Sequence, residues 1–301
     1  MLIGMPTDVL WVYWGSARWW SAEPLVIGPV VGLAALWWLG RRRLIERGPS
    51  ELEQASVSRW RGVAFLVGLA IILLALESPI DYFSQLLFWT HMVQHLLLLV
   101  VAAPLIVAGS PWLAIWEAIP ESLRSSAIST WHRPWFGATV GRFYSLVRSP
   151  AGTFAIFATV VWGWHLPYTY DLTLANGVVH DCEHLSFIVF GVAFWLQIFD
   201  SPPFERVLTE GRSVIYLIGA MGVNVVLSAA LGLSQHPWYA PYAVLSAAQR
   251  PGGVSALWDQ QFGAGIMWTL GDLPFSFTIG RCVLKWLEPE APSKVPVGSA
   301  L

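Results

Sequence analysis

Long apolar segments separated by shorter polar ones dominate the hydropathy pattern of this chain. A helix that crosses the hydrocarbon core of a bilayer needs about 20 mainly apolar residues at a rise of 1.5 Å each. The pattern predicts seven such helices, at about residues 24–40, 62–76, 86–108, 150–166, 179–199, 213–233 and 262–284. We therefore expect an all-α integral membrane protein built as a bundle of seven transmembrane helices.

The segments between and beyond these helices complete the predicted organisation. Residues 1–23 are aromatic and interrupted, which favours an interfacial segment outside the membrane. We expect one membrane domain over 24–287, followed by a polar cytoplasmic tail over 288–301. The segment 110–149 is expected to be a loop with one short amphipathic helix, and 234–261 a loop rich in Pro, Gly and Tyr.

Positive charge is distributed unevenly along the chain. Connections after the first, third, fifth and seventh predicted spans hold fifteen of the seventeen Lys and Arg residues, whereas the alternate connections hold only Arg18 and Arg250. Cytoplasmic loops carry the excess of Lys and Arg. The N-terminus is therefore expected outside and the C-terminus in the cytoplasm.

Composition agrees with a membrane protein and narrows the chemistry. The chain is 55% hydrophobic and 12% charged, whereas soluble domains carry about 25% charged residues. Its nineteen Trp residues fit two interfacial aromatic belts. The net charge of −2, with no basic block, argues against a nucleic-acid partner, and two distant cysteines give no disulfide framework.

Two pairs of histidines interrupt the apolar pattern near the ends of two predicted spans. His91 and His95 lie near the start of the third span, and His180 and His184 open the fifth. Residues four apart share one face of a helix, and polar groups within spans usually mark function. His165 ends the fourth span, so the predicted orientation brings all five imidazoles near the outer face.

This pattern favours a metal site over simple packing. Neutral imidazole is the commonest metal ligand in proteins, and four of them suit copper or zinc better than magnesium or calcium. Asp181, Glu183 and Met267 lie at similar depth and are further ligands or orienting groups in this hypothesis. Packing with ordinary hydrogen bonds stays the structural alternative.

Four stretches of the chain resemble one known family. They are HMVQHLLLLVVAAPLIVAGSP (91–111), WGWHLPYTYD (162–171), HDCEHLSFIVFGVAFW (180–195) and DQQFGAGIMW (259–268). The chain is similar in these stretches to the multi-spanning bacterial cytochrome c oxidase assembly factor family, CtaG. This resemblance implies a seven-span protein of the bacterial cell membrane that is not an enzyme. It also implies oxidase subunits as partners and a role in supplying copper to a haem–copper oxidase.

By residue, the resemblance indicates the same histidines and several neighbours. It points to His91, Gln94, His95, His165, His180, Glu183, His184, Asp259, Gln260 and Met267. Gln94 and Asp259 thereby join the set of further ligands or orienting groups, on the strength of the resemblance alone.

Two other functions fit parts of the same pattern. His180-x-x-Glu183-His184 matches the H-x-x-E-H pattern of inverted zinc proteases, in which the Glu is the base. A b-type haem could instead be held by histidines of the third and fifth spans, although pairs four residues apart suit a single metal ion better.

Several other polar or aromatic residues have expected places but no assigned chemistry. Cys182 is expected to be a small buried thiol, and Tyr168 and Tyr170 to join the outer aromatic belt. Asn224 and Asp272 lie deep in predicted spans and are expected to need partners inside the bundle.

Overall fold

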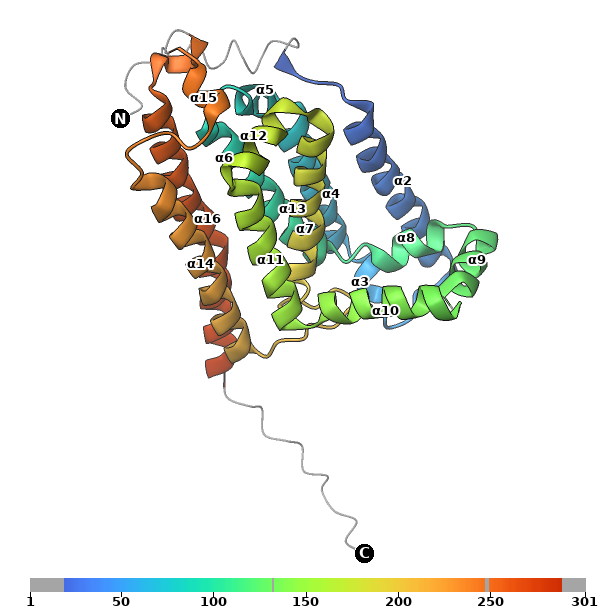
Figure 1. Cartoon of the computed structure of the whole chain (residues 1–301). Helices are drawn as coiled ribbons and strands as arrows, with labels where there is room; N and C mark the ends of the chain where they lie inside the picture. Colours follow the sequence, from blue (N-terminus) through green and yellow to red (C-terminus); the bar gives the residue numbers. More distant parts are fainter. Residues whose placement is uncertain (1–18, 132, 247–248, 289–301) are drawn as a thin grey trace, which may run out of the picture.

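The computed structural model describes residues 19–131, 133–246 and 249–288, which form a bundle of helices (Figure 1). Within the described part there is no strand, only one isolated bridge. The all-α prediction is therefore confirmed. Most of the predicted interfacial segment 1–23 and of the predicted tail 288–301 lies outside the described residues.

Helices lie over most of each of the seven ranges that the sequence predicts to be apolar spans, although the fifth ends at Trp195 and not at residue 199. They are α2 (Pro24–Arg47), α4 (Arg59–Glu77), the continuous run α6 (Phe88–Leu96), η2 (Leu97–Ala102) and α7 (Ala103–Gly109), then α11 (Pro150–His165), α13 (Gly177–Trp195), α14 (Glu210–Gly232) and α16 (Ala256–Leu287).

Five of these helices are long and apolar enough to cross a membrane: α2, α4, the run Phe88–Gly109, α13 and α14. A sixth is added if Gly137–Arg148 and Pro150–His165, which meet at 85°, form one broken span. The described residues thus contain five or six candidate spans. Helix α11 alone has only 16 residues, and the polar side chains of α16 reduce its hydropathy.

The segment 110–149 contains more helix than the sequence pattern predicted. Three helices fill it: α8 (Trp112–Ala118), α9 (Glu121–Trp131) and α10 (Pro134–Arg148). A proline lies at or just before the start of each one, where its fixed φ and missing N–H are tolerated. The expectation of a loop with one short helix was wrong because prolines that start helices were interpreted as loop residues.

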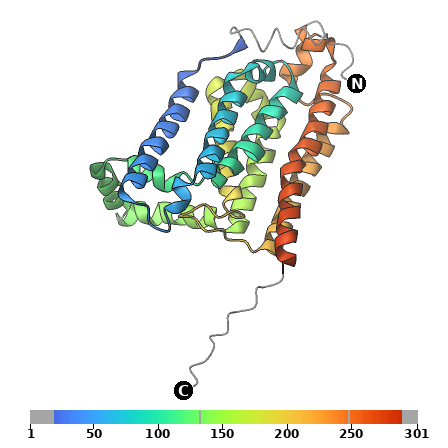
Figure 2. The ribbon, with the colours of Figure 1, turned by 180° about the vertical axis from the view of Figure 1, so that it is seen from behind.

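Short helices lie at both ends of the bundle (Figures 1 and 2). One end carries α3 (Gln54–Val57) together with α8, α9 and α10, and the other carries α5 (Pro79–Ser84), α12 (Pro167–Ala175) and α15 (Ala240–Val244). The single turn η4 (Pro251–Gly253) precedes α16. The predicted site residues at the starts of α6 and α13 and at the end of α11 therefore lie near the end with α5, α12 and α15.

The run Phe88–Gly109 lies at the centre of the bundle and contacts α4, α5, α13 and α16. Its middle, Leu97–Ala102, is π-helical, a local form that is rare and often found at functional sites. Gly109 lets α4 approach closely, because a Cβ at this position would lie 2.6 Å from the Cβ of Phe65. This close packing fixes the helix that carries His91 and His95.

The start of α6 is fixed by a residue from the far end of the sequence. The backbone N–H groups of Phe88 and Trp89 donate to the two carboxylate oxygens of Asp259, at 2.8 and 3.0 Å. The first N–H groups of a helix lack partners within the helix. The fully buried Asp259 side chain supplies them and joins α16 to the start of α6.

We expect Asp259→Ala to destabilise the protein, because it leaves two N–H groups at the start of α6 without an acceptor. Each such group costs about 1–3 kcal/mol, so the expected loss for the two is roughly 2–6 kcal/mol. The measurement is the melting temperature in detergent. Asp181→Ala is the matched control, because Asp181 is exposed, and equal melting temperatures for both variants would contradict the capping role.

Candidate metal centre

Four side chains from two facing helices converge inside the bundle. His91 and His95 come from α6, and Glu183 and His184 from α13; one ligand atom of each lies within 4.8 Å of all the others. His91 Nε2 lies 3.5 Å from Glu183 Oε2, and His95 Nε2 lies 3.6 Å from Glu183 Oε1. We call these four residues the His/Glu cluster. All of them are buried, with Glu183 and His91 fully inaccessible to solvent.

The helical repeat explains why the cluster forms. Residues four apart lie on one helix face, and the rings of His91 and His95 are 4.3 Å apart, centroid to centroid. Helix α13 presents its own pair opposite, with the His91 and His180 rings 5.1 Å apart and the His95 and His184 rings 5.8 Å apart. Two predicted same-face pairs are thus packed against each other.

The polar atoms of the His/Glu cluster lack ordinary partners. Among the described residues, Nε2 of His91 and His184, both ring nitrogens of His95 and both oxygens of Glu183 are buried without a hydrogen bond. Each unpaired buried group costs about 1–3 kcal/mol. Ligand atoms around a tetrahedral ion with bonds of about 2.0–2.1 Å lie roughly 3.3 Å apart, close to the His–Glu separations. Three imidazoles and a carboxylate fit zinc or copper.

The other two predicted imidazoles lie beside the His/Glu cluster and not within it. His180 lies at its edge, 4.1 Å from the His184 ring, and its buried Nε2 has no partner. His165 is on the other side, with its ring 5.9 Å from that of His95. Its Nδ1–H donates to the carbonyl of Val161 at 2.6 Å.

Gln94 points away from the His/Glu cluster. Its Nε2 donates to the carbonyl of Ala75 at 3.0 Å and to Asp81 Oδ1 at 2.8 Å. Gln94 therefore connects α6 to α4 and α5, and this contact fixes the rotation of the helix face that carries His91 and His95.

Three further predicted residues also lie away from the His/Glu cluster. Asp181 is exposed on α13, and Asp259 uses both carboxylate oxygens to cap α6. Gln260 accepts from the backbone N–H of Trp238 at 2.7 Å and donates to the carbonyl of Leu231 at 2.9 Å. It therefore joins the segment after α14 to α16.

Two tyrosines complete the wall of the cluster. Tyr170 is fully buried, with its ring 5.0 Å from that of His91. Its expected place in the outer aromatic belt was therefore wrong, whereas Tyr168 is exposed. Tyr242 Oη lies 3.3 Å from His91 Nδ1 and bonds to the carbonyl of Ser84. The sequence pattern missed Tyr242, because nothing distinguishes it within a loop rich in Pro, Gly and Tyr.

Two remaining expectations have opposite outcomes. Cys182 is exposed, so the prediction of a buried thiol was wrong. Asn224 and Asp272 do find partners inside the bundle, because Asn224 Nδ2 donates to Asp272 Oδ1 at 2.9 Å and to the carbonyl of Met267 at 2.8 Å.

An apolar cleft reaches the His/Glu cluster from the side of α2. Its volume is about 540 Å³, and it is lined mainly by aliphatic and aromatic side chains of α2, α4, α8 and α13. His184 and Asp181 are the polar residues of its lining. The cleft therefore extends from the face of α2 to one ligand of the cluster.

The match to a protein family covers the His/Glu cluster and the helices that carry it. The model of the cytochrome c oxidase caa3 assembly factor family, Caa3_CtaG, matches residues 35–288. The chain belongs to this family. Its apolar helices make it a multi-pass protein of the bacterial membrane.

Two curated mycobacterial proteins are similar to this chain. They are uncharacterized protein Mb0105 of Mycobacterium bovis and uncharacterized protein MT0111 of Mycobacterium tuberculosis, each 23% identical over 275 residues. The aligned region is 90% of this chain and 40% of each relative, so the chain spans about two-fifths of their length. No solved structure matches the chain significantly.

The Gln94–Asp81 contact gives a prediction about pH. Burial raises the pKa of the Asp81 carboxyl from 3.8 to about 6, with the hydrogen bond from Gln94 opposing the rise. The folded state thus binds the proton more tightly than the unfolded state, and stability falls as pH rises from about 4 to about 6.

We therefore expect Asp81→Asn, which keeps an acceptor for Gln94 but cannot ionise, to stabilise the protein more at pH 7 than at pH 5. The difference is about 1 kcal/mol. Melting temperatures of wild type and variant at the two pH values measure it. A constant difference between them would show that the ionisation of Asp81 is not linked to folding.

Proposed function

We propose that this protein is an assembly factor for a haem–copper cytochrome c oxidase, which binds copper at the His/Glu cluster and passes it to an oxidase subunit. The observation that carries this proposal is the convergence of buried ligand atoms without hydrogen-bond partners on α6 and α13. An ion at their centre would replace the missing partners of all four residues. Family membership supplies the recipient, a cytochrome c oxidase.

Two considerations favour copper over zinc as the cargo: the affinity of the site, and the proposed recipient, which is a haem–copper oxidase. An imidazole and carboxylate site binds Cu(II) more tightly than other divalent first-row ions. A cargo ion must also leave, and His180 supports this step, because its unpartnered Nε2 lies at the edge of the cluster. Ligand exchange from the cluster to His180 would start the release.

We also propose seven spans, with α11 and α16 crossing the membrane, the N-terminus outside and the C-terminus in the cytoplasm. Helix α16 packs along α14, which is long and apolar enough to cross (Figures 1 and 2). The basic C-terminal ends of α2 and α16 and the basic helix α10 lie at the end opposite α5, α12 and α15. The domain organisation 1–23, 24–287 and 288–301 belongs to this proposal.

The geometry favours a metal-ion site over the two other functions. In an H-x-x-E-H protease both histidines bind zinc and the Glu is a separate base; here Glu183 is within the ligand group and His180 is not. A haem held by histidines of α6 and α13 would need room for its macrocycle around them, but the ring of His91 lies 5.0 Å from that of Tyr170 and the ring of His95 lies 4.5 Å from that of Phe187. This close packing instead suits one small ion.

We expect purified wild-type protein to hold about one copper ion in the His/Glu cluster, and His91→Ala/His95→Ala to bind it at least tenfold more weakly. Competition with a chromophoric chelator measures the affinity, and His236→Ala is the control, because His236 is exposed in a loop. Affinity should fall at acidic pH, since protonated imidazoles cannot bind a metal. Unchanged affinity in the double variant would contradict the site, and a preference for zinc would contradict the cargo.

The same variants test delivery in cells. The double variant should give membranes with less copper-loaded oxidase, and added copper in the medium should restore part of it. If the double variant binds no copper yet supports normal oxidase assembly, the protein assists assembly by contact and not by delivering metal.

A further inference from the structure

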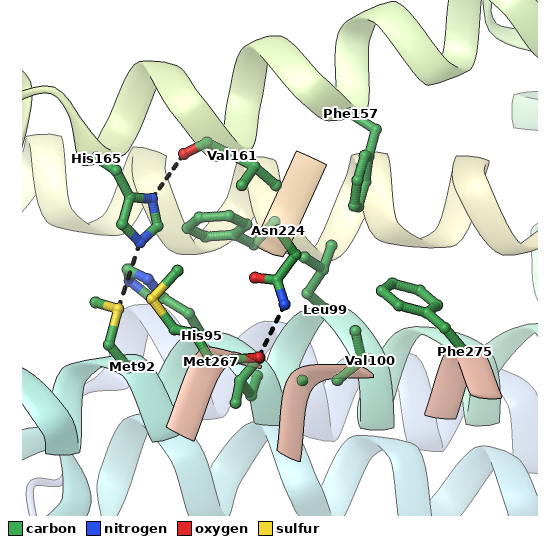
Figure 3. Close-up of a pocket in the computed structure, with 13 residues that line it drawn as sticks. Met92, His95, Leu99, Val100, Phe157, Val161, His165, Asn224, Met267 and Phe275 are labelled. Carbon is green, nitrogen blue, oxygen red and sulfur yellow. Dashed lines mark hydrogen bonds between the residues drawn. The ribbon is translucent and has the colours of Figure 1, made fainter. Parts of the chain in front are cut away.

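A second group of metal-binding side chains lies on the other side of His95. His165 from α11, Met92 from α6 and Met267 from α16 line one small cavity of about 30 Å³ (Figure 3), about the volume of one water molecule. In Figure 3 the Met92 thioether points toward the His165 ring, and the Met267 thioether lies beside Met92 and His95 in the same view. Apart from His95 and Asn224, the rest of the lining is apolar.

Neither of the two atoms at which His165 and Met92 meet carries a hydrogen that it could donate. The carbonyl of Val161 can only accept, so the Nδ1 atom that lies 2.6 Å from it carries the proton of the neutral ring. The Nε2 atom is then unprotonated and can only accept a hydrogen bond. It lies 3.3 Å from the Sδ of Met92, which has no hydrogen to donate. Two buried acceptors thus face each other.

A cation between the two acceptors removes this conflict. Protonating His165 instead would bury an imidazolium that has no carboxylate contact among the described residues, which is costly. Bonds of about 2.0 Å to nitrogen and about 2.3 Å to sulfur, at a tetrahedral angle, place the two ligand atoms roughly 3.5 Å apart. The observed 3.3 Å is close to this value.

We propose that His165 Nε2, Met92 Sδ and Met267 Sδ form a second metal site, separate from the His/Glu cluster and selective for Cu(I). Thioether sulfur is a soft ligand that favours Cu(I) over zinc and over harder divalent ions. This inference deepens the proposed function and rests on it for the role of the ion as cargo.

Two polar residues support the second site. Asn224 donates to the backbone carbonyl of Met267 and to Asp272, which fixes the turn of α16 that carries the thioether. His95 belongs to the His/Glu cluster and also lines the cavity, and its Nδ1 has no partner. Imidazole is a copper ligand in general, so an ion that the His/Glu cluster holds as Cu(I) can move to the second site by ligand exchange through His95, without any change of oxidation state.

The ordinary alternative is that both methionines only pack, as methionines in cores usually do. X-ray absorption at the copper edge separates the two cases, because it counts sulfur neighbours. Protein loaded with two equivalents of Cu(I) under reducing conditions should show sulfur scattering at about 2.3 Å. Met92→Leu/Met267→Leu should remove that scattering and lower the bound Cu(I) from about two ions to about one.

Two controls make the result specific to the second site. Met221→Leu changes a methionine of α14 that does not line the cavity, and it should leave the sulfur scattering unchanged. Glu183→Gln/His184→Ala removes two ligands of the His/Glu cluster only, so it should lose one ion and keep the sulfur-bound one. Leu for Met conserves volume, so the variants are expected to fold.

The outcomes distinguish the two proposals. Wild-type protein without sulfur scattering, or scattering that persists in Met92→Leu/Met267→Leu, would overturn the second site. A third outcome separates them: the wild type binds only one Cu(I), that ion is sulfur-bound, and it persists in Glu183→Gln/His184→Ala. This result would support the second site and contradict copper binding by the His/Glu cluster. Loss of sulfur scattering in Met221→Leu as well would also overturn it, because the signal would not come from the cavity.

Discussion

The burial of one carboxylate between the imidazoles of a facing helix is the constraint on which the rest of the site depends. Glu183 is inaccessible to solvent, and its two oxygens face His91 and His95 at 3.5 and 3.6 Å without a hydrogen bond. A buried charge that is not paired or bound to a metal is strongly unfavourable. The bundle keeps this carboxylate at the junction of α6 and α13, where a cation would compensate it.

The surrounding contacts hold the two helices in the register that this junction requires. Asp259 caps α6 from α16, and Gln94 fixes the rotation of α6 through Ala75 and Asp81. Tyr242 fills the space beside His91. These residues act on the ligands through the position of α6, which explains why several residues indicated by the family resemblance lie outside the His/Glu cluster.

The sequence predicted those features that depend on local periodicity. Apolar runs predicted a helix at each expected span, and the four-residue spacing predicted that His91 and His95 share a face. The sequence suggested Glu183 only as a further ligand or orienting group, and its burial between His91 and His95 was not predictable from periodicity, because that depends on which helix lies opposite. The approach of Met92 to His165, 73 residues away along the chain, and the place of Tyr242 likewise depend on tertiary packing.

The most direct test of the central claim is electron paramagnetic resonance of wild-type protein loaded with one equivalent of Cu(II). If the His/Glu cluster holds the ion, the pulsed spectrum shows couplings to imidazole nitrogens of more than one histidine, and Glu183→Gln/His184→Ala loses part of them. A spectrum typical of copper bound by water and carboxylate oxygens only, without nitrogen couplings, would contradict the account.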